Sequence, residues 1–356
     1  MSIIKPDNRV GFSLPRASAP RHKLIVWNMA LLVTLVLSLG LVAAQIDPGQ
    51  MTAWVSTLVP ASPAFAQEET IRGVTEQLST PALIAAMLDP DPGVRISAAQ
   101  ALGWRRAAEG TDALLKATYD PDAHVQEEAA AALGDIGQIQ ALPRLQALQV
   151  VQGNSNVQLA AFEAEDQLIG RVAAALKVPR SAVQALAVAP NGVAYAAVSD
   201  DLYVLSDGAW QRMGYLPASP NELTLGPDGQ TIYLATDSPG LYRSKNGGKI
   251  WEHGTFDQNS PTPWTVTAAV INPGNPQEIY IALASIGAEN GQEDSLGIFA
   301  SRDGGTTWQP VSKSPDWAVT RKLILDPATP GFLYGLTDAA PYRLALTGDA
   351  MEFMSN

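Results

Sequence analysis

The stretch "SRDGGTTW" (Ser301–Trp308) has a near copy earlier in the chain, "SKNGGKIW" (Ser244–Trp251). Each copy has a Ser, then Asp or Asn, then two glycines and a final Trp. Each copy also follows a short apolar run, "LYR" or "IFA", of a kind that is typical of β-strands. Asp or Asn before two glycines predicts a tight polar turn, because glycine adopts a positive φ without strain. The two copies therefore indicate a structural unit that is repeated.

Residues 181–356 carry four copies of one strand pattern. Each copy has an apolar run, a turn near a proline, a second run with a central tyrosine, and a third run. The markers are the prolines Pro190, Pro227, Pro273 and Pro327 and the tyrosines Tyr195, Tyr233, Tyr280 and Tyr334. Units of three or four short strands at this spacing are typical of β-propeller blades. The sequence therefore predicts a small four-blade β-propeller, as a closed ring or an open arc, with the tyrosines in its core.

The two glycine turns resemble the Asp-box of sialidase-type (BNR) β-propellers, a group that includes sortilin-like receptors and photosystem II assembly factors. The matching residues are Ser244, Asn246, Gly248, Trp251, Ser301, Asp303, Gly305 and Trp308. The resemblance implies an architectural role at the blade periphery. We expect Asn246 and Asp303 to accept hydrogen bonds from backbone amides two residues further on, and the tryptophans to pack between strands.

Sialidase-like glycoside hydrolysis stays a minor alternative. Such enzymes hold their substrate's carboxylate with an arginine cluster. The arginines of residues 181–356 are Arg212, Arg243, Arg302, Arg321 and Arg343. Most of them occupy the boxes or equivalent strand positions, so no convincing triad is left, and we expect no enzymatic activity and no catalytic residue.

Upstream, "LDPDPGVRISAAQALG" (88–103) and "YDPDAHVQEEAAAALG" (119–134) superpose at a fixed offset of 31 residues. Each copy predicts a helix, an Asp-Pro-Asp turn and a second helix whose first turn is capped by the second Asp. The pattern resembles the HEAT-like repeats of phycobilisome-lyase type, which implies a protein-binding helical solenoid over residues 73–178. Lyase activity is not implied. A degraded third copy, "NVQLAAFEAEDQLIGRVAAAL", is expected to cap the stack.

The N-terminal region predicts a membrane anchor. Residues 24–46, "LIVWNMALLVTLVLSLGLVAAQI", form 23 uncharged residues, enough for a helix of roughly 35 Å. Five basic residues lie in the tail 1–23, and the next one is Arg72. This asymmetry predicts a cytoplasmic tail, with everything after Ile46, including the linker 47–72, in the periplasm, a lumen or at the cell surface. The alternative is a cleaved signal that ends at Ala66, and it exports the rest of the chain as well.

Composition limits the ligands. The net charge is −12, from 23 basic and 35 acidic residues, which disfavours nucleic acid as a partner. The chain has no cysteine, and its three histidines show no ligand spacing, so we expect no metal site and no cofactor. An acidic insertion in the third blade, residues 286–295, offers Glu289, Glu293 and Asp294 as candidate partner-binding residues. A calcium site there is the alternative to a solvated loop.

The three parts together predict a non-enzymatic, membrane-tethered scaffold. Such a protein would assemble or stabilise a membrane protein complex by binding its protein subunits through the helical repeats and the propeller. The resemblance to photosystem assembly factors favours a photosynthetic or respiratory complex. An exported receptor-like protein that binds a peptide or a glycan is the alternative.

Overall fold

The structure is a computed structural model that describes residues 78–356, apart from 152, 237–239, 255–263, 287–292, 313–317, 326–330, 338–339, 347–350 and 354–356. The chain divides into two units, residues 1–60 and 61–356, and all described residues belong to the second. Within these described residues, no helix is both long and apolar enough to cross a membrane. The predicted anchor 24–46 and its flanks 1–23 and 47–72 lie outside them.

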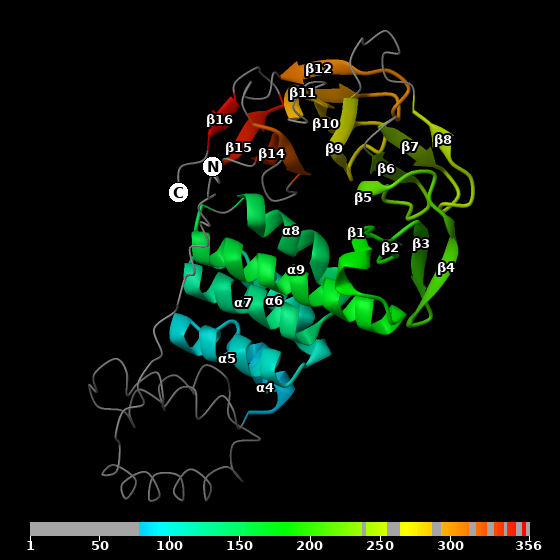
Figure 1. Cartoon of the computed structure of the whole chain (residues 1–356). Helices are drawn as coiled ribbons and strands as arrows, with labels where there is room; N and C mark the ends of the chain where they lie inside the picture. Colours follow the sequence, from blue (N-terminus) through cyan, green and yellow to red (C-terminus); the bar gives the residue numbers. More distant parts are fainter. Residues whose placement is uncertain are drawn as a thin grey trace, which may run out of the picture. The chain divides into compact units, whose positions relative to one another are not determined.

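The described helices form three pairs, which we call units 1 to 3 (Figure 1). The pairs are α4 (Thr80–Ala86) with α5 (Pro92–Trp104), α6 (Thr111–Ala117) with α7 (Ala123–Ile136), and α8 (Leu142–Val151) with α9 (Ser155–Leu176). Short 3-10 turns, η2 (Ala108–Gly110), η3 (Ile139–Ala141) and η4 (Arg180–Ala182), precede α6, α8 and the first strand.

Side chains at the predicted turns cap the second helix of each unit. Asp91 accepts a hydrogen bond from the amide of Gly93, and Asp122 accepts from the amides of His124 and Val125. Asn154 caps α9 in the same way, so the predicted caps are confirmed and the third unit follows the pattern of the first two.

The second helices α5, α7 and α9 lie side by side and pack closely through small residues. A Cβ added to Gly103 would lie 2.9 Å from Ala132, and one added to Gly134 would lie 2.7 Å from Ala164. Six alanines of α5 and α7 are buried in the stack, namely Ala98, Ala99, Ala101, Ala129, Ala130 and Ala132. The units thus form a short helical stack with a continuous core.

After the stack come four antiparallel sheets of four strands each, and each sheet keeps its strands in chain order. The first sheet has β1 (Val183–Val188), β2 (Ala194–Val198), β3 (Asp201–Ser206) and β4 (Ala209–Tyr215); the second has β5 (Pro220–Leu225), β6 (Ile232–Thr236), β7 (Leu241–Ser244) and β8 (Glu252–His253). The third has β9 (Trp264–Ile271), β10 (Ile279–Ile286), β11 (Glu293–Ser301) and β12 (Gln309–Ser312); the fourth has β13 (Thr320–Ile324), β14 (Phe332–Thr337), β15 (Pro341–Ala345) and β16 (Met351–Phe353).

The four sheets follow one another in a propeller-like arc, in which β1, β5, β9 and β13 are the inner strands (Figure 1). Each inner strand packs against the inner strand of the next sheet along the chain. The marker tyrosines lie on the second strands and are nearly inaccessible to solvent, which confirms them as core residues. These residues are Tyr195, Tyr233, Tyr280 and Tyr334.

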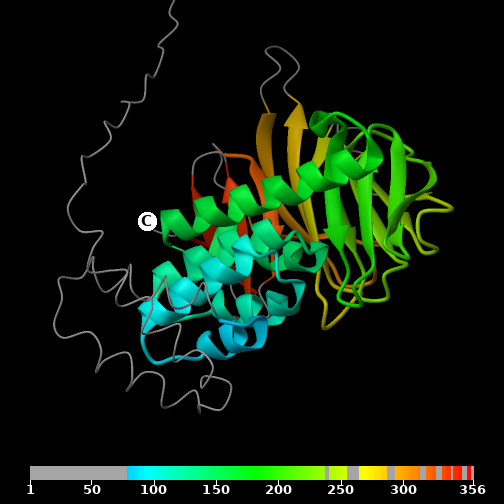
Figure 2. The same cartoon turned by 90° about the horizontal axis from the view of Figure 1, so that it is seen from below.

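The helices of unit 3 close the arc. Helix α8 packs against β1 on one side and against β13, β14 and β15 on the other, and α9 packs against β1. Figure 2 shows the long helix α9 reaching from the stack to the green strands of the first sheet. One apolar core runs from the helices into this sheet, through Val172 of α9, Leu186 of β1 and Ala196 of β2. The open-arc alternative is therefore the observed one, and helices cover the gap.

Candidate interaction site

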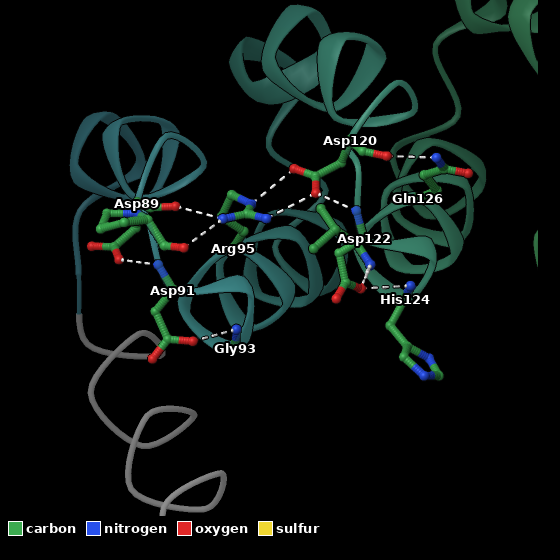
Figure 3. A network of polar contacts seen from close by, with 10 residues as sticks. Asp89, Asp91, Gly93, Arg95, Asp120, Asp122, His124 and Gln126 are labelled. Atoms are coloured by element: carbon green, nitrogen blue, oxygen red, sulfur yellow. Dashed lines mark hydrogen bonds and ion pairs between the residues drawn. The ribbon is translucent and has the colours of Figure 1, made fainter.

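A polar ladder joins the turns of units 1 and 2 (Figure 3). The guanidinium of Arg95 donates from Nε and Nη2 to the two carboxylate oxygens of Asp120, both at 2.8 Å, and from Nη1 to the carbonyl oxygen of Asp89 at 2.7 Å. The Arg95 and Asp120 side chains are only 12% and 10% exposed. Asp120 also accepts from the amide of Asp122, so this carboxylate serves both its turn and the contact between units. Such a two-point pair fixes orientation as well as distance.

Two further arginines join neighbouring units. Arg144 of α8 donates to the hydroxyl and the carbonyl oxygen of Thr118, at 2.8 and 2.9 Å, and its guanidinium lies 3.5 Å from the ring centre of Tyr119. Arg171 of α9 donates to the carbonyl oxygen of Asp135 at 2.7 Å. The repeat pattern in the sequence does not mark these arginines, although each has a turn or a helix end of the preceding unit within reach. Asp91 and Asp122 act as helix caps, and Asp120 acts as a turn and pairing residue. The Nδ1 atom of the exposed His124 lies 3.5 Å from Oε2 of Glu127.

The contact between unit 3 and the fourth sheet includes an ion pair. Lys322 of β13 donates to Gln149 Oε1 of α8 at 3.1 Å and to Glu165 Oε2 of α9 at 3.2 Å. Gln146 and Gln149 donate to the same carboxylate at 2.8 and 2.6 Å. The lysine and glutamate side chains are 17% and 14% exposed, so the pair is largely shielded from water.

Glu165 interrupts the apolar pattern of the repeats. At the same distance from the N-caps Asp91, Asp122 and Asn154 stand Leu102, Leu133 and Glu165, and both leucines are completely buried. Burial alone would raise the pKa of Glu165, but Lys322 and the hydrogen bonds from Gln146 and Gln149 outweigh it and hold the pKa below its ordinary value. The carboxylate is therefore charged, and the fourth sheet supplies its counter-ion.

A second largely buried carboxyl group, that of Glu222, lies on the inner strand β5. It accepts a hydrogen bond from the amide of Ala269 on β9 at 2.6 Å. The residue keeps some accessible surface, but protein atoms surround its carboxyl end, and this burial raises its pKa to about 8. The bond to Ala269 and the charge of Lys322 act in the opposite direction and are weaker. Glu222 is thus mostly protonated at neutral pH.

Other side chains extend this connection along the inner strands. Asn221 of β5 donates to the carbonyl oxygen of Val266 on β9 at 3.2 Å, and Thr267 of β9 donates to the carbonyl oxygen of Thr320 on β13 at 2.7 Å. Together with the bonds of Lys322, these polar contacts link β5 to β9, β9 to β13 and β13 to the helices of unit 3.

The predicted box Ser301–Trp308, the later one in the chain, is a turn between β11 and β12. The hydroxyl of Ser301 accepts from the amide of Gly305 at 2.7 Å, and Asp303 accepts from the amides of Thr306 and Thr307 at 2.9 and 2.8 Å. The hydroxyl and amide of Thr307 lower the pKa of Asp303 well below its ordinary value. The expected hydrogen bond from the amide two residues further on was wrong. The double-glycine turn brings the amides three and four residues further on to the carboxylate instead.

The second box, Ser244–Trp251, has the same geometry between β7 and β8. Asn246 accepts from the amide of Ile250 at 2.9 Å, and Ser244 accepts from the amide of Gly248 at the same distance. The φ angles of Gly247 and Gly248 are +69° and +85°, and those of Gly304 and Gly305 are +70° and +85°, as the turn requires.

Both turns pack on the preceding sheet. Tyr233 of the second sheet donates to the carbonyl oxygen of Gly304 at 2.9 Å, and a Cβ on Gly248 would lie 2.1 Å from Leu202 of the first sheet. Trp251 packs in the core between the first and second sheets, and Trp308 packs between the second and third, each partly buried. These contacts connect successive sheets; membership of the Asp-box group stays a resemblance.

The acidic insertion is in part regular structure. Glu293 and Asp294 belong to β11 and pair with Ile286 and Ser285 of β10. The expected loop over 286–295 is therefore wrong at both ends, because the two strands continue into it as a hairpin. Glu289 lies outside the described residues, and partner binding by these three acids stays a prediction.

The described part of the chain contains no group of three or more His, Cys, Asp or Glu residues that could hold a metal ion. Three of the arginines weighed for a sialidase-like site contact groups of their own or the neighbouring sheet. Arg212 pairs with Asp201 at 2.6 Å, Arg243 with Glu252 at 3.0 Å and with the Gly304 carbonyl oxygen, and Arg343 lies over the ring of Phe332. Arg321 lies on β13, and Arg302 follows β11 in the box turn.

Residues 80–164 match the family model of HEAT repeats, so the helical stack is of that kind. No curated protein matches the chain. Similar solved structures include a GH74 enzyme from Niastella koreensis (17% identity, 49% of this chain and 30% of that one, TM-score 0.37) and YCF48 bound to D1 peptide (15% identity, 49% and 55%, TM-score 0.34). The chain thus spans less than two thirds of either protein. Nothing about function follows from similarities of this size.

The Lys322–Glu165 pair should matter more than an exposed pair on the same helix. Lys322→Met leaves a largely buried carboxylate without its cation, and we expect a loss of about 3–5 kcal/mol in unfolding free energy. Adding Glu165→Leu, which restores the leucine of units 1 and 2, should recover at least half of that loss. The control Asp166→Asn breaks the exposed pair with Arg180 and should cost less than about 1 kcal/mol.

Guanidinium unfolding of the four proteins, followed by tryptophan fluorescence, measures these differences. A loss for Lys322→Met no larger than that for Asp166→Asn would show that the junction does not depend on the ion pair.

Glu222 should make stability depend on pH. Because its pKa is raised to about 8 in the folded chain, the folded state binds more protons than the unfolded state between the ordinary carboxyl pKa and pH 8. The free energy of unfolding therefore falls as pH rises through this window, by at most about 1.4 kcal/mol per pH unit. Glu222→Gln keeps an acceptor for Ala269 and should flatten the profile.

Melting temperatures from pH 5 to 9 test this effect. The neighbouring variant Asn221→Ala removes an inner-strand side chain that does not titrate, so it should lower the whole profile without changing its slope. Parallel profiles for the wild type and Glu222→Gln would contradict the assignment.

Proposed function

We propose that this protein is a non-enzymatic scaffold that is tethered to a membrane and holds the protein subunits of a membrane complex during assembly or in the assembled state. The observation that carries the proposal is the junction of two binding architectures into one body. A HEAT-type stack and a propeller-like arc share an apolar core, and unit 3 closes the arc through Lys322. Such a body presents two broad surfaces in a fixed relation to each other.

The proposed location follows from the N-terminal sequence. Residues 24–46 would anchor the chain, with residues 1–23 in the cytoplasm and the stack and arc on the other side of the membrane. A tether confines the scaffold to the membrane surface and raises its effective concentration near membrane-embedded partners.

The client class rests on chemistry and on resemblance. The chain is acidic, with a net charge of −12, and this favours partner segments with a basic surface. A photosynthetic or respiratory complex is the preferred client, because the box turns resemble those of photosystem assembly factors. Two subunits held in a fixed relation are what an assembly intermediate requires.

Isolation of the full chain in mild detergent tests the proposal. We expect the protein to stay in the membrane pellet after an alkaline wash, its intact mass to include residues 1–46, and subunits of one membrane complex to co-purify with it. A matched chain with a cleavable signal in place of residues 1–46 should be soluble and should capture less of the same subunits.

A mature protein that starts at Gln67 would contradict the tether but not export. Capture of a soluble peptide or a glycan, without any membrane complex, would favour a receptor. Turnover of a glycoside by the purified chain would contradict the non-enzymatic assignment.

A further inference from the structure

The last helix of the stack, α9, leaves part of its stacking face exposed. In α5 and α7, one face packs on the second helix of the next unit, and small residues make that contact. Gly103 of α5 faces Ala132 of α7, and Gly134 of α7 faces Ala164 of α9. About one turn before these glycines stand Ala99 and Ala130, each completely buried. This face is therefore an established interface in units 1 and 2.

In α9 the equivalent face carries large apolar residues that are exposed. At the same distance from the N-caps as Ala99 and Ala130 stands Phe162, which is 59% exposed. Leu159, one turn earlier on the same face, is 57% exposed. The terminal unit of a solenoid normally turns a polar face to solvent. The sequence-based expectation that the third unit caps the stack is therefore wrong for this face.

Only part of the face is open. Asp166 takes the place of Gly103 and Gly134, and it pairs with Arg180 of η4, next to which α9 packs against β1. η4 and β1 therefore cover part of α9. The open part of the face is the stretch around Leu159 and Phe162, flanked by the exposed Glu163.

We propose that Leu159 and Phe162 are the docking site for an amphipathic helix of a partner protein, which takes the position of the next second helix in the stack. The inference rests on the proposed scaffold function and names the surface that function uses. A helix fits this face because the same face of α5 and of α7 is covered by one. The partner helix carries small apolar residues towards Phe162 and a basic residue towards Glu163.

A second copy of this chain fits the face less well. Two such faces would bring the two Glu163 carboxylates, and two chains of net charge −12, towards each other. A partner helix with a basic flank has complementary charge.

The test places the photo-crosslinking amino acid p-benzoylphenylalanine at position 162 of the full chain, in the cells that make it. The matched control places it at Ile250, which is 66% exposed but lies in a turn of the second sheet. We expect a crosslink from position 162, and none from position 250, to a helical segment of a subunit that co-purifies with the wild type.

A peptide of the crosslinked segment is then titrated against the detergent-solubilised full chain by fluorescence anisotropy. The double variant Leu159→Gln/Phe162→Gln should weaken binding by about tenfold or more, because truncating central apolar anchors costs most of an interface's energy. Ile250→Gln should change it by less than about twofold. Both variants replace exposed side chains, so we expect their melting temperatures to equal that of the wild type. Equal melting temperatures would exclude misfolding as the cause of weaker binding.

A crosslink from position 162 to a second copy or to residues 1–77 of the same chain would overturn the inference. So would normal co-purification of the complex with the Leu159→Gln/Phe162→Gln variant, which would leave the scaffold function intact. If the wild type itself captures no membrane subunit, the scaffold function fails, and the inference fails with it.

Discussion

The architecture depends on one constraint: among the described strands, no further sheet packs on the far side of β13, the inner strand of the fourth sheet. β13 packs on β9 and then meets α8 rather than β1. The gap between the first and fourth sheets is covered by two kinds of contact. On the side of the first sheet, unit 3 shares an apolar core with β1 and β2. On the side of the fourth sheet, Lys322 pairs with Glu165, whose carboxylate also accepts hydrogen bonds from the side-chain amides of Gln146 and Gln149.

This closure gives the helical repeats a second role. Apolar burial is non-directional, whereas a shielded ion pair with two further donors fixes position, so the two contacts together hold the arc at a defined opening. The cost is a charged residue where the earlier units have a leucine. Unit 3 is thus both the last layer of the stack and the closing element of the arc.

Much of the local structure could be predicted because its causes lie close together in the chain. The Asp-Pro-Asp turns, the caps at Asp91 and Asp122 and the marker tyrosines follow from short-range chemistry and from repetition. The closure could not be predicted in the same way, since Gln149 and Glu165 meet Lys322 across more than 150 residues of chain. One signal was available: Glu165 breaks the leucine pattern, and a buried carboxylate requires a partner from elsewhere.

The sequence predicted the candidate sites less completely than the fold. The box turns lie where the strand pattern placed them, but the Asp303 carboxylate accepts from amides later than expected. The path of the chain through the two glycines is set by their φ angles, which the residue types alone do not specify. The exposed face of α9 was missed because Leu159 and Phe162 have the spacing of core residues. Only the end of the stack shows that nothing in the described chain covers them.

The central claim is that stack and arc form one cooperative body. Native-state hydrogen exchange of the full chain in detergent, at increasing guanidinium concentration, measures the opening free energy of each segment. We expect buried amides of α7 and of β9 to exchange through a single opening, with the same free energy and the same denaturant dependence. Exchange of the β9 amides at a concentration that leaves those of α7 protected would contradict it.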